Sequence, residues 1–133
     1  MRKPSIWRLV AAAALAALTV GSLVLVRRPA SVSDVLRKLD FEYQNGGLFQ
    51  FFWNTRGRQN AVTLEALRRA GLPDHARLFA QAVQIFEGEK PWLEHDWRAF
   101  DASPDVRIYA AARARSGFAS LDAAWQALPQ LPT

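Results

Sequence analysis

The sequence predicts an all-α protein in which an N-terminal transmembrane helix precedes a compact bundle of about five to six short helices. The first observation is an apolar run without a single charge, Leu9–Val26. The second is that apolar residues in the rest of the chain recur at the three- and four-residue spacing of one helix face. The third is that serine, asparagine, glycine and proline divide these segments where helices start and stop. No segment alternates apolar and polar residues well enough to predict a strand.

Composition and charge restrict the classes of protein to which the chain can belong. Its 133 residues, 50% hydrophobic and 22% charged, are typical of one globular domain. Five of the 17 basic residues lie within residues 1–28, and the other 12 are balanced by 12 acidic residues. Cysteine is absent, which excludes disulfides, thiolate catalysis and cysteine-bound zinc. We divide the chain into a signal anchor (1–28), a helical domain (29–128) and a tail (129–133) that we expect to fray.

The N-terminal apolar run is long enough to cross a bilayer. As a helix, Leu9–Val26 would extend about 27 Å, and a hydrocarbon core is about 30 Å thick. A cleaved signal peptide usually has an apolar core of about 7 to 15 residues followed by small residues, whereas Arg27-Arg28-Pro29 follows here at once. Cleavage near Ala30, Ser31 or Ser33 is the alternative, and we expect an uncleaved anchor.

Basic residues flank the run on both sides, so the positive-inside rule barely discriminates between the two orientations. Because the start resembles a secretory signal, we expect the short N-terminal tail in the cytoplasm and the domain outside it. The expected location is the inner (cytoplasmic) membrane, with a single span and a periplasmic or otherwise extracytoplasmic domain.

The first helix after the anchor is expected to begin at Ser31 and to continue to Gln44. In Ser31-Val32-Ser33-Asp34 a serine hydroxyl can accept a hydrogen bond from a free backbone N–H, and the Asp34 carboxylate suits the positive end of a helix. Apolar residues then follow at the spacing of one helix face, namely Val32, Val35, Leu36, Leu39 and Tyr43.

Asn45-Gly46-Gly47 interrupts this pattern. An Asn-Gly pair between apolar residues is a strong hairpin signal, but the residues up to Gln44 are predicted to be helical, which leaves a hairpin without its first strand. We therefore interpret the two glycines as a helix C-terminus, where a residue able to adopt positive φ turns the chain. The i, i+4 pairs Leu48–Phe52 and Phe49–Trp53 suit a short buried helix. Two helices should meet at a sharp glycine corner.

Further helices are expected along the rest of the chain. One runs from a cap at Asn60 to a stop at Gly71, and Pro73 can occupy the first turn of the next. Pro91 can open another short helix, and Ser103-Pro104-Asp105 marks one more start. The apolar faces of these helices contain Leu64, Leu67, Leu78, Phe79, Ala82, Val83, Phe86, Leu93, Trp97, Phe100, Leu121, Ala124, Trp125 and Leu128.

Residues with catalytic or metal-binding chemistry are few. Glu94, His95 and Asp96 could supply metal ligands, but adjacent residues on a helix point in different directions. The sequence contains neither a nucleophile elbow nor a glycine-rich phosphate loop. We expect no enzymatic activity, no metal and no cofactor. Unpaired carboxylates keep open the alternative of a periplasmic hydrolase-like enzyme, namely Asp40, Glu42 and Asp101.

Nucleic-acid binding is also not expected. Arg56, Arg58, Arg68 and Arg69 lie near aromatic residues, a combination that occurs on nucleic-acid surfaces. The domain after residue 28 is nevertheless electrically balanced, and charged helix faces are usually only solvated.

One stretch combines an asparagine, two glycines, a glutamine, two aromatics, a second asparagine and the glycine that ends the next helix, namely Asn45, Gly46, Gly47, Gln50, Phe51, Phe52, Asn54 and Gly71. This pattern resembles that of a bacterial all-α domain family of unknown function that is named for a DNA-mimic protein. The resemblance covers roughly residues 31–128 and fades beyond Glu87. Leu48 replaces the aromatic residue that is usual there, and Phe49 stands where a polar residue is common.

This resemblance implies a compact helical domain without known catalytic activity, in which Asn45-Gly46-Gly47 is a helix corner and the aromatic pair is core. In the founding member an acidic surface imitates DNA and occupies a DNA-binding protein, commonly as a dimer. Imitation requires carboxylates at nearly the density of phosphates, whereas acidic and basic residues are equal in number after residue 28. We expect a membrane-tethered domain that binds a protein partner, with a homodimer left open and DNA mimicry as the alternative.

Overall fold

A computed structural model describes residues 28–132. It contains the helices α2 (Val32–Thr55), α3 (Asn60–Arg69), α4 (Pro73–Ala102), α5 (Val106–Arg115) and α6 (Ala119–Gln126). No strand occurs between residues 28 and 132, so the prediction of an all-helical bundle is confirmed for this part of the chain. The predicted span Leu9–Val26 lies outside the described residues. None of the helices within the described range has the length and apolar character needed to cross a bilayer.

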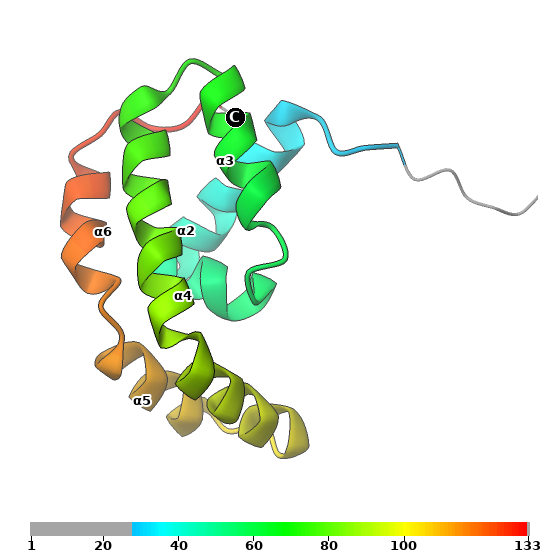
Figure 1. Cartoon of the computed structure of the whole chain (residues 1–133), viewed down its shortest axis with the longest axis vertical. Helices are drawn as coiled ribbons and strands as arrows, with labels where there is room; N and C mark the ends of the chain where they lie inside the picture. Colours follow the sequence, from blue (N-terminus) through cyan, green and yellow to red (C-terminus); the bar gives the residue numbers. More distant parts are fainter. Residues whose placement is uncertain (1–27, 133) are drawn as a thin grey trace, which may run out of the picture.

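The helices pack around α2 and α4. α2 contacts α3 and α6, while α4 contacts α3, α5 and α6. In Figure 1, α3 and α6 flank α4 on opposite sides, α2 runs behind it, and α5 lies below. This arrangement brings the beginning of the domain, in α2, next to its end, in α6.

α2 begins at the predicted capping box. The Ser31 hydroxyl accepts a hydrogen bond from the Asp34 backbone N–H at 3.1 Å, and the Asp34 carboxylate accepts one from the Ser31 backbone N–H at 3.3 Å. The hydrogen bonds from Ser31 also lower the pKa of Asp34. The side chains of Ser31 and Asp34 thus each accept a hydrogen bond from the backbone N–H of the other residue, which stabilises the start of α2.

The predicted glycine corner divides α2 into two helical segments. Gly46 is extended, with φ −174°, and Gly47 has φ +74°, the left-handed region that favours glycine. Asn45 keeps a local role because its side-chain amide donates to the Phe41 carbonyl at 2.8 Å. The chain therefore turns at Gly47, as a helix corner and not as a hairpin.

The stop of α3 follows the sequence prediction, but its start does not. Asn60 is the first residue of the helix and makes no capping bond; Gln59 precedes it, also without a side-chain cap. At the other end, Gly71 has φ +69° and donates to the Arg68 carbonyl, while Leu72 donates to the Leu67 carbonyl, both at 3.0 Å. This pair of bonds is the Schellman motif, which a glycine at this position permits.

Pro91 does not open a new helix, contrary to the prediction. α4 passes through it without interruption from Pro73, which does occupy the first turn, to Ala102. A proline inside a helix removes one hydrogen bond and tends to kink the axis, and Figure 1 shows α4 changing direction where its colour passes from green to yellow-green. Phe86, Leu93 and Trp97 nevertheless form one continuous buried stripe, whose packing offsets the lost bond.

The described residues after α6 pack against the domain through Leu131, although we expected residues 129–133 to fray. The Leu131 side chain is only 7% exposed, and the Pro129 carbonyl lies 3.0 Å from Nε2 of the buried His75. The domain therefore extends beyond Leu128. Trp125 lies edge-on against His75, and these two buried side chains lie beside the segment.

An aromatic cluster forms the centre of the core. Phe52 is fully buried and stacks on Phe79, Phe86 and Phe118, with ring centroids 4.8–5.6 Å apart. Phe51 meets Phe79 edge-on at 5.6 Å. These rings come from two helices, α2 and α4, and from the loop before α6, so the aromatic pair after the corner joins α2 to both of the other segments.

Candidate functional site

The glycine corner is completed by a residue from the other end of the domain. Leu48 starts the second segment of α2, and its backbone N–H donates to the Asp122 carboxylate at 3.0 Å. Tyr43 lies just before the corner and donates its hydroxyl to the Asp122 carbonyl at 3.1 Å. A Cβ atom on Gly47 would stand 2.7 Å from this carboxylate, closer than atoms normally approach. Gly47 is therefore required both by its positive φ and by the close approach of Asp122.

The polar residues of the matching pattern also make tertiary contacts. The Gln50 side-chain oxygen accepts a hydrogen bond from the Tyr109 hydroxyl on α5. Asn54 donates its side-chain amide to the Glu42 carboxylate at 2.8 Å, which connects the two segments of α2 across the corner. Burial raises the pKa of Tyr109, and Glu42 adds to the shift while Arg113 opposes it.

An apolar groove adjoins these residues where α2, the end of α4 and the start of α5 meet. Its volume is about 370 Å³. Val106, at its edge, is 75% exposed, the highest value among the large hydrophobic side chains between residues 28 and 132. We call this surface the motif groove; it is lined by Gln50, Trp53, Asn54, Phe100, Pro104, Val106 and Tyr109.

The carboxylates of the domain are distributed, and half of them are paired with an arginine. Asp101 illustrates this, because its hydrogen bonds from Arg56 lower the pKa of the carboxyl group. Such pairing leaves little of the dense negative charge with which a protein surface could stand in for a phosphate backbone. Six of the 12 acidic residues pair with an arginine, namely Asp34 with Arg37, Glu65 with Arg69, Asp74 with Arg77, Asp96 with Arg115, Asp101 with Arg56, and Asp105 with Arg107.

The three carboxylates considered for hydrolysis occupy different settings. Asp40 lines a pocket beside α6, Glu42 is bound by Asn54, and Asp101 is bound by Arg56. Asp101 does share a surface hollow with Glu94, but three basic side chains also line it: Arg56, Lys90 and Arg98. Because Asp101 is held ionised by Arg56, its carboxylate is a poor proton donor.

Neither histidine belongs to a metal site in the described part of the chain. His75 is buried against Trp125 and bonded to the Pro129 carbonyl, and His95 is exposed on α4. Across residues 28–132 no group of three histidine, aspartate or glutamate side chains is arranged to hold an ion.

Asp122 and Tyr109, the partners that complete the corner and the groove, were not predicted from the sequence. Asp122 lies 74 residues from Leu48, and Tyr109 lies 59 residues from Gln50. No local pattern marks either residue, because an aspartate in the first turn of α6 and a tyrosine on α5 are both common helix residues. Only the packing of α5 and α6 against α2 brings them to the corner.

The model of a family described as DMP19-like protein matches residues 28–132. No curated protein and no solved structure matches the chain.

Proposed function

Because the chain belongs to the family of DMP19-like proteins, we propose that it is a helical protein-binding domain that its N-terminal segment tethers to a membrane. The motif groove is the surface that we assign to the partner. The observation that supports it most is the exposure of Val106, 75%, beside the half-buried Phe100 and Tyr109. Apolar walls with a few polar groups suit an apolar segment of another protein.

We expect the partner to bind the groove with apolar side chains and not through complementary charges. Gln50 and Asn54 offer hydrogen-bonding groups at the groove, but no charged residue is among those that line it. Binding should therefore vary only weakly with salt. Imitation of DNA would instead require an array of carboxylates, and six of those in the domain are paired with arginines.

A pull-down of the full chain from detergent-solubilised membranes tests the groove. Val106→Glu should abolish capture of the partner, because a carboxylate in the apolar groove has no counter-ion. Val62→Glu is the matched control, since Val62 on α3 is 42% exposed and lies outside the groove. Loss of capture in Val62→Glu with retention in Val106→Glu would assign binding to another face. Light scattering of the same samples shows whether the partner is a second copy of the chain.

The same preparation tests the alternative of DNA mimicry. Captured protein should remain bound at moderate salt, and duplex DNA should not displace it. Tight capture of a bacterial DNA-binding protein that weakens steeply with salt and is competed away by duplex DNA would restore the role of a mimic, since electrostatic contacts are screened over about 8 Å at physiological ionic strength.

The tether is supported by the uncharged run Leu9–Val26 followed at once by Arg27-Arg28-Pro29. Carbonate extraction should leave the protein in the membrane fraction, with an intact mass that includes the run. A soluble product that starts between Ala30 and Asp34 would show cleavage. A C-terminal reporter that is active only outside the cytoplasm should give signal, and activity of a cytoplasm-only reporter would reverse the orientation.

A further inference from the structure

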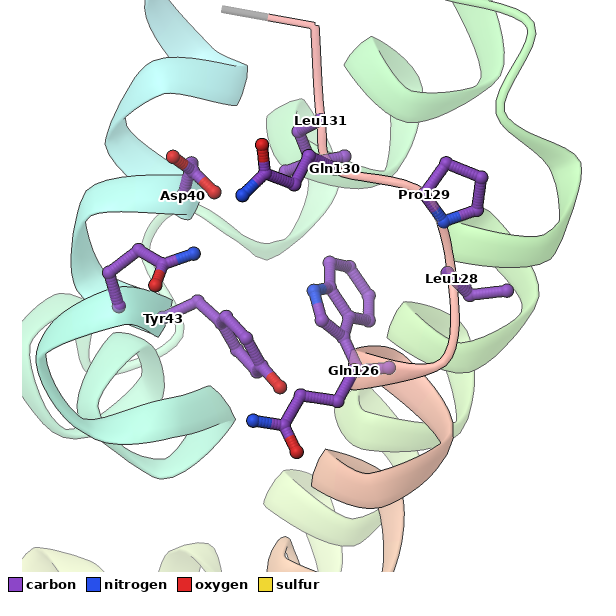
Figure 2. Close-up of a pocket in the computed structure, with 9 residues that line it drawn as sticks. Asp40, Tyr43, Gln126, Leu128, Pro129, Gln130 and Leu131 are labelled. Carbon is purple, nitrogen blue, oxygen red and sulfur yellow. The ribbon is translucent and has the colours of Figure 1, made fainter.

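The pocket that Asp40 lines, beside α6, lies at the other side of the corner. It is a pocket of about 230 Å³ between the first segment of α2, the end of α6 and the C-terminal segment. Figure 2 shows the polar ends of Asp40 and Gln130 turned toward each other, with those of Tyr43 and Gln126 at the opposite side. We call it the tail pocket; it is lined by Asp40, Tyr43, Gln44, Trp125, Gln126, Leu128, Pro129, Gln130 and Leu131.

The walls of the tail pocket are fixed by contacts outside its opening. The Tyr43 hydroxyl donates to the Asp122 carbonyl, and the Pro129 carbonyl is bonded to His75. The rings of Tyr43 and Trp125 lie 5.8 Å apart and form an apolar base. These contacts, made by buried and half-buried side chains, fix the positions of the pocket walls.

The polar groups of the pocket are available to a ligand. Asp40 and the amides of Gln44, Gln126 and Gln130 form no hydrogen bond or ion pair with other side chains in residues 28–132. Arg37, the nearest arginine along the helix, pairs with Asp34 at 3.6 Å. Four side chains with acceptor oxygens therefore surround one opening.

The charge of the lining selects the ligand. Asp40 is the only formally charged side chain among the lining residues, so an anionic ligand would be repelled and a cationic one attracted. A guanidinium or ammonium group carries several N–H donors and no acceptor, which complements a carboxylate and amide oxygens. A volume of 230 Å³ admits a single side chain but not a folded element.

We propose that the tail pocket binds the basic head of an arginine or lysine side chain. The head lies against Asp40 with the glutamine amides as further acceptors, and the methylene stem packs on Leu128 and Pro129. The site stands independently of the motif groove, because the two surfaces share no lining residue. Its ligand is either a side chain of a bound protein or a free guanidinium or ammonium compound, which share the same chemistry.

The test is a titration of the full chain in detergent micelles, followed by NMR. The probe is N-acetyl-arginine methylamide, and the neutral isostere is N-acetyl-citrulline methylamide. The Trp125 indole N–H and the side-chain amides of Gln126 and Gln130 should shift and saturate with the arginine probe. Asp40→Asn should weaken this binding about tenfold or more, the loss expected for a charge-assisted hydrogen bond.

Glu87→Gln is the matched control, because it removes one negative charge from an exposed position on α4 outside the pocket. This variant should bind the probe as the wild type does, and thermal unfolding of both variants should show that each is folded. Equal responses to arginine and citrulline probes, or unchanged binding in Asp40→Asn, would overturn the proposal.

A second arm identifies the source of the ligand and separates this site from the proposed function. If the arginine probe displaces a captured protein, the pocket holds a side chain of that partner. If the probe binds while capture is unaffected, the pocket takes a free cation. Probe binding without any captured protein would sustain the pocket while removing the support for protein binding.

Discussion

The Asp122 carboxylate and the Leu48 backbone N–H, 3.0 Å apart, join the last helix of the domain to the corner inside the first. The bond replaces the side-chain cap that the second segment of α2 lacks in its own sequence, where Gly46 and Gly47 precede Leu48. A helix start without such an acceptor leaves backbone N–H groups unsatisfied. One residue of α6 therefore caps a helix 74 residues away.

Removal of this cap should destabilise the domain. Asp122→Ala is expected to lower the free energy of unfolding by about 1–2 kcal/mol, the usual cost of losing a capping oxygen. Asp122→Asn retains an oxygen acceptor and should cost less. Urea denaturation followed by circular dichroism measures both, and equal stability of the alanine variant and the wild type would contradict the capping role.

A comparison of alanine substitutions at Gly47 and Gly71 measures how much the close approach of Asp122 adds to the loss of stability. Both have positive φ, +74° and +69°, but a Cβ at Gly47 would stand 2.7 Å from Asp122, whereas one at Gly71 would meet no atom within 4 Å. Gly71→Ala should cost about 1 kcal/mol, the strain of an alanine at positive φ. Gly47→Ala should cost clearly more, as should the bulkier Gly47→Val. Similar unfolding midpoints for the two alanine variants would show that the corner accommodates the added Cβ atom without a further loss of stability.

The C-terminal segment should contribute to stability through Leu131. Because this side chain is buried, Leu131→Ala is expected to lower the free energy of unfolding by roughly 2 kcal/mol. Gln130→Ala changes the exposed neighbour and should have little effect on thermal unfolding. A frayed tail would instead make both variants indistinguishable from the wild type.

The domain should lose stability at alkaline pH through Tyr109. Burial raises its pKa above the ordinary 10.0, so the folded state holds the phenolic proton more tightly than the unfolded state does. Its contribution is complete below the unfolded pKa and is lost as pH rises through the folded pKa. Tyr109→Phe should make the decline of stability above about pH 10 shallower. Part of the decline should remain, because the pKa of Tyr43 is also raised by burial. Urea denaturation between neutral and alkaline pH measures the slope, and an unchanged slope would assign the decline to other groups.

Local signals predicted the features that depend on neighbouring residues. The capping box at Ser31, the turn at Gly47 and the stop at Gly71 each need only a few residues in sequence, and all three are present. The aromatic pair Phe51 and Phe52 follows helical spacing and is buried as expected.

Features that depend on packing between distant residues were not predictable in the same way. Pro91 has the sequence signature of a helix start, yet the buried stripe of Leu93 and Trp97 continues the face of Phe86, and packing keeps α4 intact. The proline-rich end has the composition of a frayed tail, but His75 and Trp125 supply a surface for it. The tail pocket and the motif groove likewise join α2 to segments more than 40 residues later.

Under the proposed tether, the capping box at Ser31 would also limit the distance between the domain and the bilayer. The helix begins at Val32, so under the proposed tether only residues 27–31 separate the domain from the span that ends at Val26. This linker is no longer than about 20 Å even when fully extended. Its length is thus less than the diameter of a small domain, roughly 30 Å. The domain would then be confined to a thin layer above the lipid headgroups. Partners confined to the same layer would meet it at a raised effective concentration, while bulky soluble proteins would be excluded from the side that faces the lipid.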